Sequence, residues 1–93
     1  MNDLFEPVWG NHIEREKRNR ILLTLWAYAY EIKNKPMVSD RLFDCLATYI
    51  DPAIETGRLD EWWRENFNPA TGMWIHNHPE LHLVEVMYVS NNN

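Results

Sequence analysis

Asp40 and Asp44 have the residue type and the spacing of a possible binding site on a helix. Side chains four residues apart lie on one face of a helix, and Ser39, directly before them, is a favoured N-cap residue. Two carboxylates in this position could bind a ribose or a cation. The alternative is that both only complement the positive end of the helix dipole.

Three histidines lie close together in the sequence, at His76, His78 and His82. His78 and His82 are four residues apart, a spacing that binds zinc on some helices. The pattern His-Glu-x-x-His is absent, however, and Pro79 follows His78 directly. We therefore expect a polar surface or a capping role for the histidines, and no metal site.

The chain of 93 residues contains five tryptophans, and two of them, Trp62 and Trp63, are adjacent. Consecutive residues on a helix diverge by about 100°, so both rings cannot face one core. We expect one of the pair to be exposed and to form, with Trp74, an aromatic patch that anchors a partner.

The negative charge of the chain is concentrated in its second half. The net charge is −5, and residues 47–93 contain seven acidic residues against Arg58 and Arg64. This imbalance disfavours binding to a phosphate backbone and favours a protein partner with a basic surface, although an acidic surface can also serve solubility alone. The acidic residues predicted to contact such a partner are Asp51, Glu55, Asp60, Glu61 and Glu65.

The local signals predict a small all-α bundle of about four helices in a single domain, residues 1–93, with a long first helix packed on the second. Residues 1–10 read as an irregular lead-in and residues 90–93 as a frayed tail. The predicted helices cover 12–33, 40–56 with a kink or restart at Asp51-Pro52 and a stop at Gly57, 60–66, and 79–89, where a strand is the alternative.

The helix signals also predict which side chains are buried. Asn11 and Glu14 have the spacing of a capping box for the first helix. Its first half, residues 14–20, is a run of basic residues interrupted by Glu14 and Glu16. We expect it to project into solvent as a salt-bridged face and expect no nucleic acid partner. The residues predicted to face the core include Leu25, Trp26, Leu42, Phe43, Leu46, Tyr49 and Ile50.

Neither a signal peptide nor a membrane span is expected. The N-terminus lacks a basic region followed by an apolar run, and the longest apolar stretch, residues 21–30, is too short to cross a bilayer. Cys45 is the single cysteine and lies in an apolar stretch, which predicts a buried, unreactive thiol. These features predict a protein of the reducing cytoplasm.

Two segments resemble the small N-terminal helical domain of NAD-dependent DNA ligases. Residues 28–44 read Tyr-Ala-Tyr-Glu-Ile-Lys-Asn-Lys-Pro-Met-Val-Ser-Asp-Arg-Leu-Phe-Asp, and residues 78–81 read His-Pro-Glu-Leu. In that family the domain recognises the nicotinamide mononucleotide (NMN) half of NAD. Small phage and prophage proteins related to these ligases look similar.

The resemblance implies a cofactor site at five positions, of which three match the family. Tyr30 corresponds to the tyrosine that stacks on the nicotinamide ring, and Asp40 and Asp44 correspond to the two aspartates. Glu31 replaces a histidine and Phe43 replaces a second tyrosine. A glutamate would repel the nucleotide phosphate that a histidine could contact, so we expect weak NMN or NAD binding or none.

Catalysis is not expected from this chain. It contains no Lys-x-Asp-Gly nucleophile motif, and it is far shorter than the nucleotidyltransferase domain of a ligase. We predict a non-catalytic binding module, phage- or prophage-encoded by resemblance, that acts on a protein partner without a cofactor. The alternatives are an NMN- or NAD-binding module and an acidic inhibitor of a host defence complex, similar to anti-CRISPR proteins.

Overall fold

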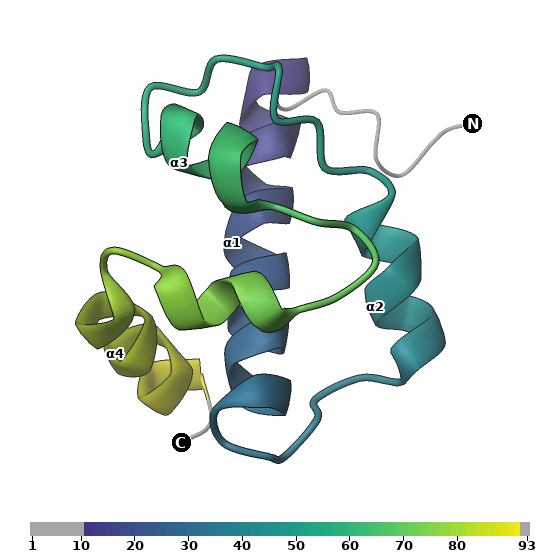
Figure 1. Cartoon of the computed structure of the whole chain (residues 1–93), viewed down its shortest axis with the longest axis vertical. Helices are drawn as coiled ribbons and strands as arrows, with labels where there is room; N and C mark the ends of the chain where they lie inside the picture. The colour runs from purple at the N-terminus through teal and green to yellow at the C-terminus, as the bar shows by residue number, and fades with distance from the viewer. Residues whose placement is uncertain (1–10, 92–93) are drawn as a thin grey trace.

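The computed structural model describes residues 11–91, and over these residues it contains helices and irregular segments but no strand (Figure 1). The predicted all-α class and the long first helix are therefore confirmed. The predicted lead-in, residues 1–10, and the last two residues of the predicted tail lie outside the described residues. The helices are α1 (His12–Glu31), α2 (Asp40–Ala47), α3 (Asp60–Asn66), the 3₁₀ helix η1 (Met73–Asn77) and α4 (Leu81–Asn91).

The ends of the first two helices are set by local capping. The Asn11 side chain accepts a hydrogen bond of 3.0 Å from the backbone N–H of Glu14, as its spacing predicts. Asn34, three residues beyond α1, adopts a positive φ of 59°, which asparagine tolerates better than most residues. Ser39 then accepts a bond of 3.1 Å from the N–H of Leu42 and caps α2.

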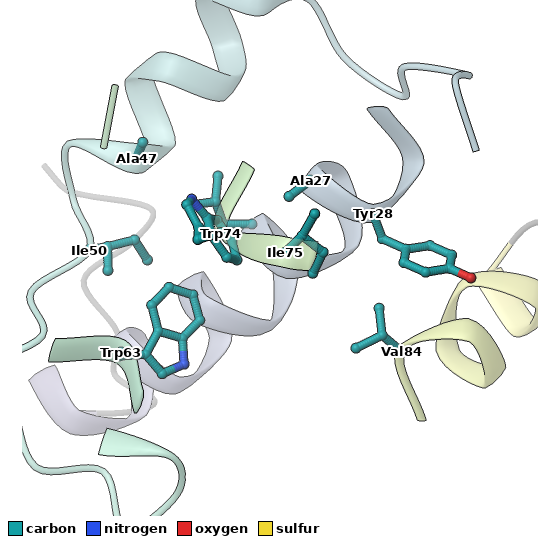
Figure 2. Packing of buried hydrophobic residues seen from close by; sticks show 9 residues of the cluster. Ala27, Tyr28, Ala47, Ile50, Trp63, Trp74, Ile75 and Val84 are labelled. Carbon is teal, nitrogen blue, oxygen red and sulfur yellow. The ribbon is translucent and has the colours of Figure 1, made fainter. Parts of the chain in front are cut away.

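The core forms around α1, which packs against α2, η1 and α4. Figure 2 shows Trp74 and Ile75 of η1 lying against α1, with Ile50 to one side and Val84 of α4 to the other. Because η1 crosses α1 between α2 and α4 (Figure 1), the second half of α1 is covered on several sides. The buried cluster comprises Leu23, Ala27, Tyr28, Ala47, Ile50, Trp63, Trp74, Ile75 and Val84.

The C-terminal helix is attached to α1 by polar bonds as well as by apolar packing. The Tyr28 hydroxyl donates to the Glu85 carboxylate, and Lys33 Nζ lies 3.2 Å from Glu85 Oε1. The segment predicted as helix or strand is therefore a helix whose inner face contains Val84, which is 2% exposed. Ser90 and Asn91, predicted to fray, belong to this helix.

The second helix is shorter than predicted. It ends at Ala47, and residues 48–59 are irregular, without the kinked or restarted helix expected at Asp51-Pro52. Side chains of α1 set this conformation: Glu16 accepts from the N–H of Asp51 at 3.0 Å, and Arg20 donates to the Asp51 carbonyl at 3.1 Å. Arg20 also donates to the Ile54 carbonyl at 3.0 Å, so three backbone groups of this segment are bonded to α1.

Several burial predictions for the first two helices are wrong. A two-turn α2 buries a single face, so Leu42, predicted to face the core, is 47% exposed. Tyr49, also predicted to face the core, lies in the turn after the helix and is 67% exposed. Cys45, predicted as a buried thiol, is also exposed. Leu25 and Ile50 are buried as predicted, whereas Trp26 and Leu46 are only partly buried.

No helix in the part of the chain that the structure describes combines the length and the apolar character needed to cross a membrane.

Candidate functional site

The five residues predicted as a cofactor site line one pocket. Its volume is about 360 Å³, and Tyr30, Glu31, Asp40, Phe43 and Asp44 all contribute to its lining. The linker that joins α1 to α2 and the chain just before η1 complete the wall, together with Trp26. The remaining lining residues are Pro36, Met37, Val38, Ala70, Thr71, Gly72 and Met73.

The pocket arises from two helix ends joined by a short linker. Trp26 and Tyr30 are four residues apart on α1, and Asp40 and Asp44 are four apart on α2, so each pair lies on one helix face. Phe43 shares that face of α2 and is partly buried against the core. Trp26 was not predicted here, although its spacing from Tyr30 would have indicated it.

Gly72 forms the closest point of the opposite wall. A Cβ atom at this position would lie 3.3 Å from Cζ of Phe43, and 3.6 Å from both Cβ of Ala27 and Cγ of Glu31. The chain before η1 therefore approaches Phe43 of α2 so closely that a side chain at this position would force the Phe43 ring to shift. This contact between distant segments has no local sequence signal.

The pocket is acidic and aromatic. Glu31, Asp40 and Asp44 are its charged lining residues, and no lining residue is basic. Among the described residues, neither Asp40 nor Asp44 forms an ion pair. The nearest partner of Glu31 is His76, whose Nε2 lies 3.8 Å away. Carboxylates beside aromatic faces form an environment that attracts a cation.

The tryptophan patch is mainly part of the core. Trp63 and Trp74 are each 3% exposed, so Trp74 and one of the adjacent pair cannot anchor a partner on the surface. Trp62 is partly buried: its ring contacts Trp63, Trp74 and His78, and its Nε1 donates to the Asn77 carbonyl at 3.1 Å. The prediction of an exposed tryptophan therefore holds only for part of the Trp62 ring.

The acidic residues predicted as a partner surface divide into two groups. Asp51, Glu55, Glu61 and Glu65 are exposed, and Glu55 lies 3.1 Å from Arg64. Asp60 is buried, and its Oδ1 lies 2.7 Å from Nη1 of Arg20. Asp60 therefore does not belong to a docking surface, contrary to the prediction.

The first half of α1 carries a buried ionic cluster that the sequence did not predict. Glu16 and Arg20, expected in solvent, are 2% and 4% exposed. Arg20 Nε donates to Glu16 at 2.7 Å, so the cluster of Glu16, Arg20 and Asp60 connects α1 to the start of α3. The i, i+4 spacing of Glu16 and Arg20 predicts that they form an ion pair, but it does not predict that the pair is buried.

Hydrogen bonds stabilise the charged form of Asp60. Burial by itself would raise its pKa, but the N–H and hydroxyl of Thr56, the Arg20 guanidinium and the N–H of Gly57 all donate to the carboxylate. Their combined effect holds the pKa of Asp60 well below its usual range. Gly57, predicted as a helix stop, adopts φ 91° in the turn that presents its N–H to Asp60.

The histidines are not part of any group of side chains, within the described residues, that could hold a metal ion. No group of three potential ligands occurs among residues 11–91. Burial lowers the pKa of His78, and its Nδ1 accepts a hydrogen bond of 3.0 Å from the N–H of Glu80. His78 thus caps the start of α4 as a neutral ring, in agreement with the predicted capping role.

A scan against protein-family models, a search of curated proteins and a search of solved structures each find nothing that matches this chain.

Proposed function

We propose that this chain is a non-catalytic binding module that holds a basic side chain of a protein partner in the pocket between α1 and α2. The observation that carries the proposal is the composition of the pocket: it contains three carboxylates and no base, beside aromatic side chains. An arginine or lysine side chain is the protein group that such a pocket complements, because it can pair with a carboxylate and lie over a ring.

Two of the carboxylates support this assignment most directly. Asp40 and Asp44 have no ion-pair partner among the described residues, so neither must give up an existing bond to accept a cation. Tyr30 is 47% exposed at the pocket, so part of its ring is open to a ligand. A carboxylate and a ring face can hold one guanidinium together.

A second candidate function is recognition of NMN or NAD in the same pocket. It is supported by the position of all five predicted residues in one lining. The nicotinamide ring of NAD⁺ is a cationic aromatic ring and suits Tyr30 and the carboxylates. The phosphate does not, because the lining offers it three negative groups and no positive one. As candidate ligands of this pocket, NMN and NAD therefore rank behind a basic side chain.

The test is a titration of the protein followed by NMR, with arginine amide, lysine amide, glutamate amide and NMN as separate probes. We expect saturable shifts of the Tyr30, Asp40 and Gly72 amides with the two cationic amides, at dissociation constants near 1 mM, which is about 4 kcal/mol. The glutamate amide should produce none. In D40N/D44N the cationic probes should lose saturable binding.

The matched control is E61Q/E65Q, which removes the same charge from two exposed positions of α3. It should bind the cationic probes as the unchanged protein does. An equal loss of cationic-probe binding in D40N/D44N and in E61Q/E65Q would show that overall charge, and not the pocket, attracts the probes. NMN binding tighter than about 100 μM, or about 5.5 kcal/mol, that is lost in Tyr30→Ala would replace the proposal with the second candidate.

A further inference from the structure

A second concave surface, separate from the acidic pocket, lies between α1, α4 and the chain before α3. Its volume is about 630 Å³, and it shares no lining residue with the acidic pocket. Figure 1 shows α4 and the last part of the loop that leads into α3 on the same side of α1. We call this surface the α1–α4 groove; its floor includes Trp63 and Val84, which are both buried.

The walls of the α1–α4 groove expose apolar side chains. Ile21 on α1 and Leu83 and Val86 on α4 are 51%, 45% and 59% exposed, and all three line the groove. Single exposed apolar residues are common on protein surfaces. Three that converge on one concave surface are typical of an interaction site.

The charges of the α1–α4 groove have the opposite sign to those of the acidic pocket. Lys17, Arg20 and Arg58 line it, against the single acid Glu80. Arg20 is neutralised by its buried carboxylate partners. Lys17 and Arg58 are 44% and 63% exposed, and each forms a surface ion pair, with Glu14 and with Glu80 respectively. Such exposed pairs contribute little to stability, so a carboxylate of a partner can replace Glu14 or Glu80 at small cost. His78 adds no charge, because burial lowers its pKa.

The secondary structure restricts how a protein segment could bind here. Over residues 11–91 the chain offers no strand edge, so an extended peptide has no backbone to pair with. Two neighbouring helices instead present ridges and grooves into which a third helix packs. The apolar wall residues Leu83 and Val86 are three apart on α4, a spacing that meets the apolar stripe of another helix.

We propose that the α1–α4 groove binds an amphipathic helix of a protein partner, whose apolar stripe covers Ile21, Leu83 and Val86 and whose acidic residues pair with Lys17 and Arg58. The acidic character follows from charge complementarity with the two exposed bases. This site is independent of the acidic pocket. A chain with both sites contacts a basic and an acidic element through opposite parts of α1.

The test uses a synthetic helical peptide of about 18 residues, or five turns, with a leucine stripe and flanking glutamates. Two further peptides serve as probes: one with lysines in place of the glutamates, and one of the same composition with the stripe scrambled. Binding is measured by fluorescence anisotropy. We expect the acidic amphipathic peptide to bind at least about tenfold more tightly than either of the others, a difference of about 1.4 kcal/mol.

The variants distinguish this groove from apolar surface in general. Val86→Asp should weaken the acidic peptide at least about tenfold. The control Val89→Asp changes another exposed valine of α4, 46% exposed, that does not line the groove, and should leave affinity unchanged. K17E/R58E should reverse the preference toward the lysine peptide. All substituted side chains are exposed, and circular dichroism checks that each variant is folded.

Three results would overturn the proposal. The first is no saturable binding of the acidic peptide. The second is an equal loss of affinity for this peptide in Val86→Asp and Val89→Asp. The third is a concentration-dependent dimer that Val86→Asp abolishes, measured by light scattering, because the groove would then be covered by a second copy of this chain.

Discussion

Two groups of carboxylates, one near each end of α1, have different surroundings. Near its N-terminal half, Glu16 and Asp60 are buried, and both are bonded to Arg20. Near its C-terminal end, Glu31, Asp40 and Asp44 line an open pocket without a base. The same type of side chain is therefore bonded to a buried base at one end, whereas at the other end Asp40 and Asp44 have no ion-pair partner among the described residues.

The buried carboxylates also bind the backbone. Asp60 accepts from the N–H groups of Thr56 and Gly57 at 3.0 Å and 2.7 Å, and Glu16 accepts from that of Asp51. A buried charge is costly unless its hydrogen-bonding capacity is satisfied. Here the ion pairs with Arg20 and these backbone bonds offset the cost, and they fix residues 51–59, a segment without regular structure before α3. Among residues 11–91, the side chains of Asp40 and Asp44 accept no such backbone bonds.

The largest expected effect follows from removing the cation of the buried cluster. Arg20→Met leaves Glu16 and Asp60 buried without their counter-charge, which typically costs 3 to 5 kcal/mol. For a small domain this is a large share of the free energy of unfolding. Chemical denaturation measures the change. The control Arg18→Met replaces an exposed arginine of the same helix and should stay within about 0.5 kcal/mol of the unchanged protein.

The second prediction concerns the pH dependence of stability. The pKa of Asp60 in the folded state is held well below the unfolded value of 3.8. At a pH between these two pKa values, Asp60 is protonated in the unfolded chain but not in the folded chain. The contribution of Asp60 is thus fully present above about pH 5 and is lost as the pH falls through 3.8 and below.

Asp60→Asn tests this directly. The variant should be less stable at pH 7, because the charge-assisted bonds from Arg20 and Gly57 are weakened. Its free energy of unfolding should also decline less steeply between pH 5 and about pH 3 than that of the unchanged protein. Denaturation series at stepped pH measure both slopes. Parallel slopes would show that Asp60 does not account for the acid sensitivity.

Local signals predicted most of the helices. Asn11 and Ser39 are caps whose side-chain bonds the structure contains, and Pro36 follows the end of α1. The choice of helix for residues 79–89 was correct because the described part of the chain offers no strand to pair with. Each of these features depends on residues within a few positions of one another.

Residues 48–59 could not be predicted in this way. Their conformation depends on bonds from Glu16 and Arg20, which lie more than 30 positions earlier, and helical periodicity contains no information about such bonds. The charged pattern of residues 14–20 suggested a solvated face, since most ionic residues are exposed. Only the fold places Asp60 opposite Arg20.

The candidate site was predicted in part. Its five positions came from a resemblance to a known motif, and they adjoin because a helix end, a linker and a helix start are consecutive in the chain. The opposite wall, with Gly72, is brought in by tertiary packing and has no sequence signal. For the adjacent tryptophans, helical geometry predicted that the two rings diverge, but not that Trp63 is the buried one.

The third prediction concerns a substitution that narrows the acidic pocket without changing its charge. Gly72→Ala places a Cβ atom 3.3 Å from Phe43 Cζ, so the ring must shift. Overpacking costs about 1–3 kcal/mol, whereas replacing glycine at a φ of −103° recovers about 0.4–1 kcal/mol through the unfolded state. We expect a net loss of about 1 kcal/mol with weaker binding of the arginine probe. Unchanged binding would show that the wall before η1 does not contact the ligand.

The smallest expected effect is the one that most sharply separates the two groups of carboxylates. The double substitution D40N/D44N removes two electrostatic contributions to the free energy of unfolding that have opposite signs. Asp40 in the first turn of α2 interacts favourably with the helix dipole, by about 0.3–1 kcal/mol. Two like charges four residues apart repel by about 0.2–0.5 kcal/mol. The free energy of unfolding should therefore change by less than about 0.5 kcal/mol, while binding of the arginine probe is lost.

Chemical denaturation at low and high salt measures this small change. Both terms act between exposed groups and are screened within about 10 Å at 0.1 M salt, so the difference between D40N/D44N and the unchanged protein should shrink further as salt rises. A loss of 2 kcal/mol or more, on the scale of a buried hydrogen bond to a charged group, would mean that Asp40 and Asp44 hold the fold together as Glu16 and Asp60 do. The contrast between the two ends of α1, and with it the basis for a binding pocket, would then be wrong.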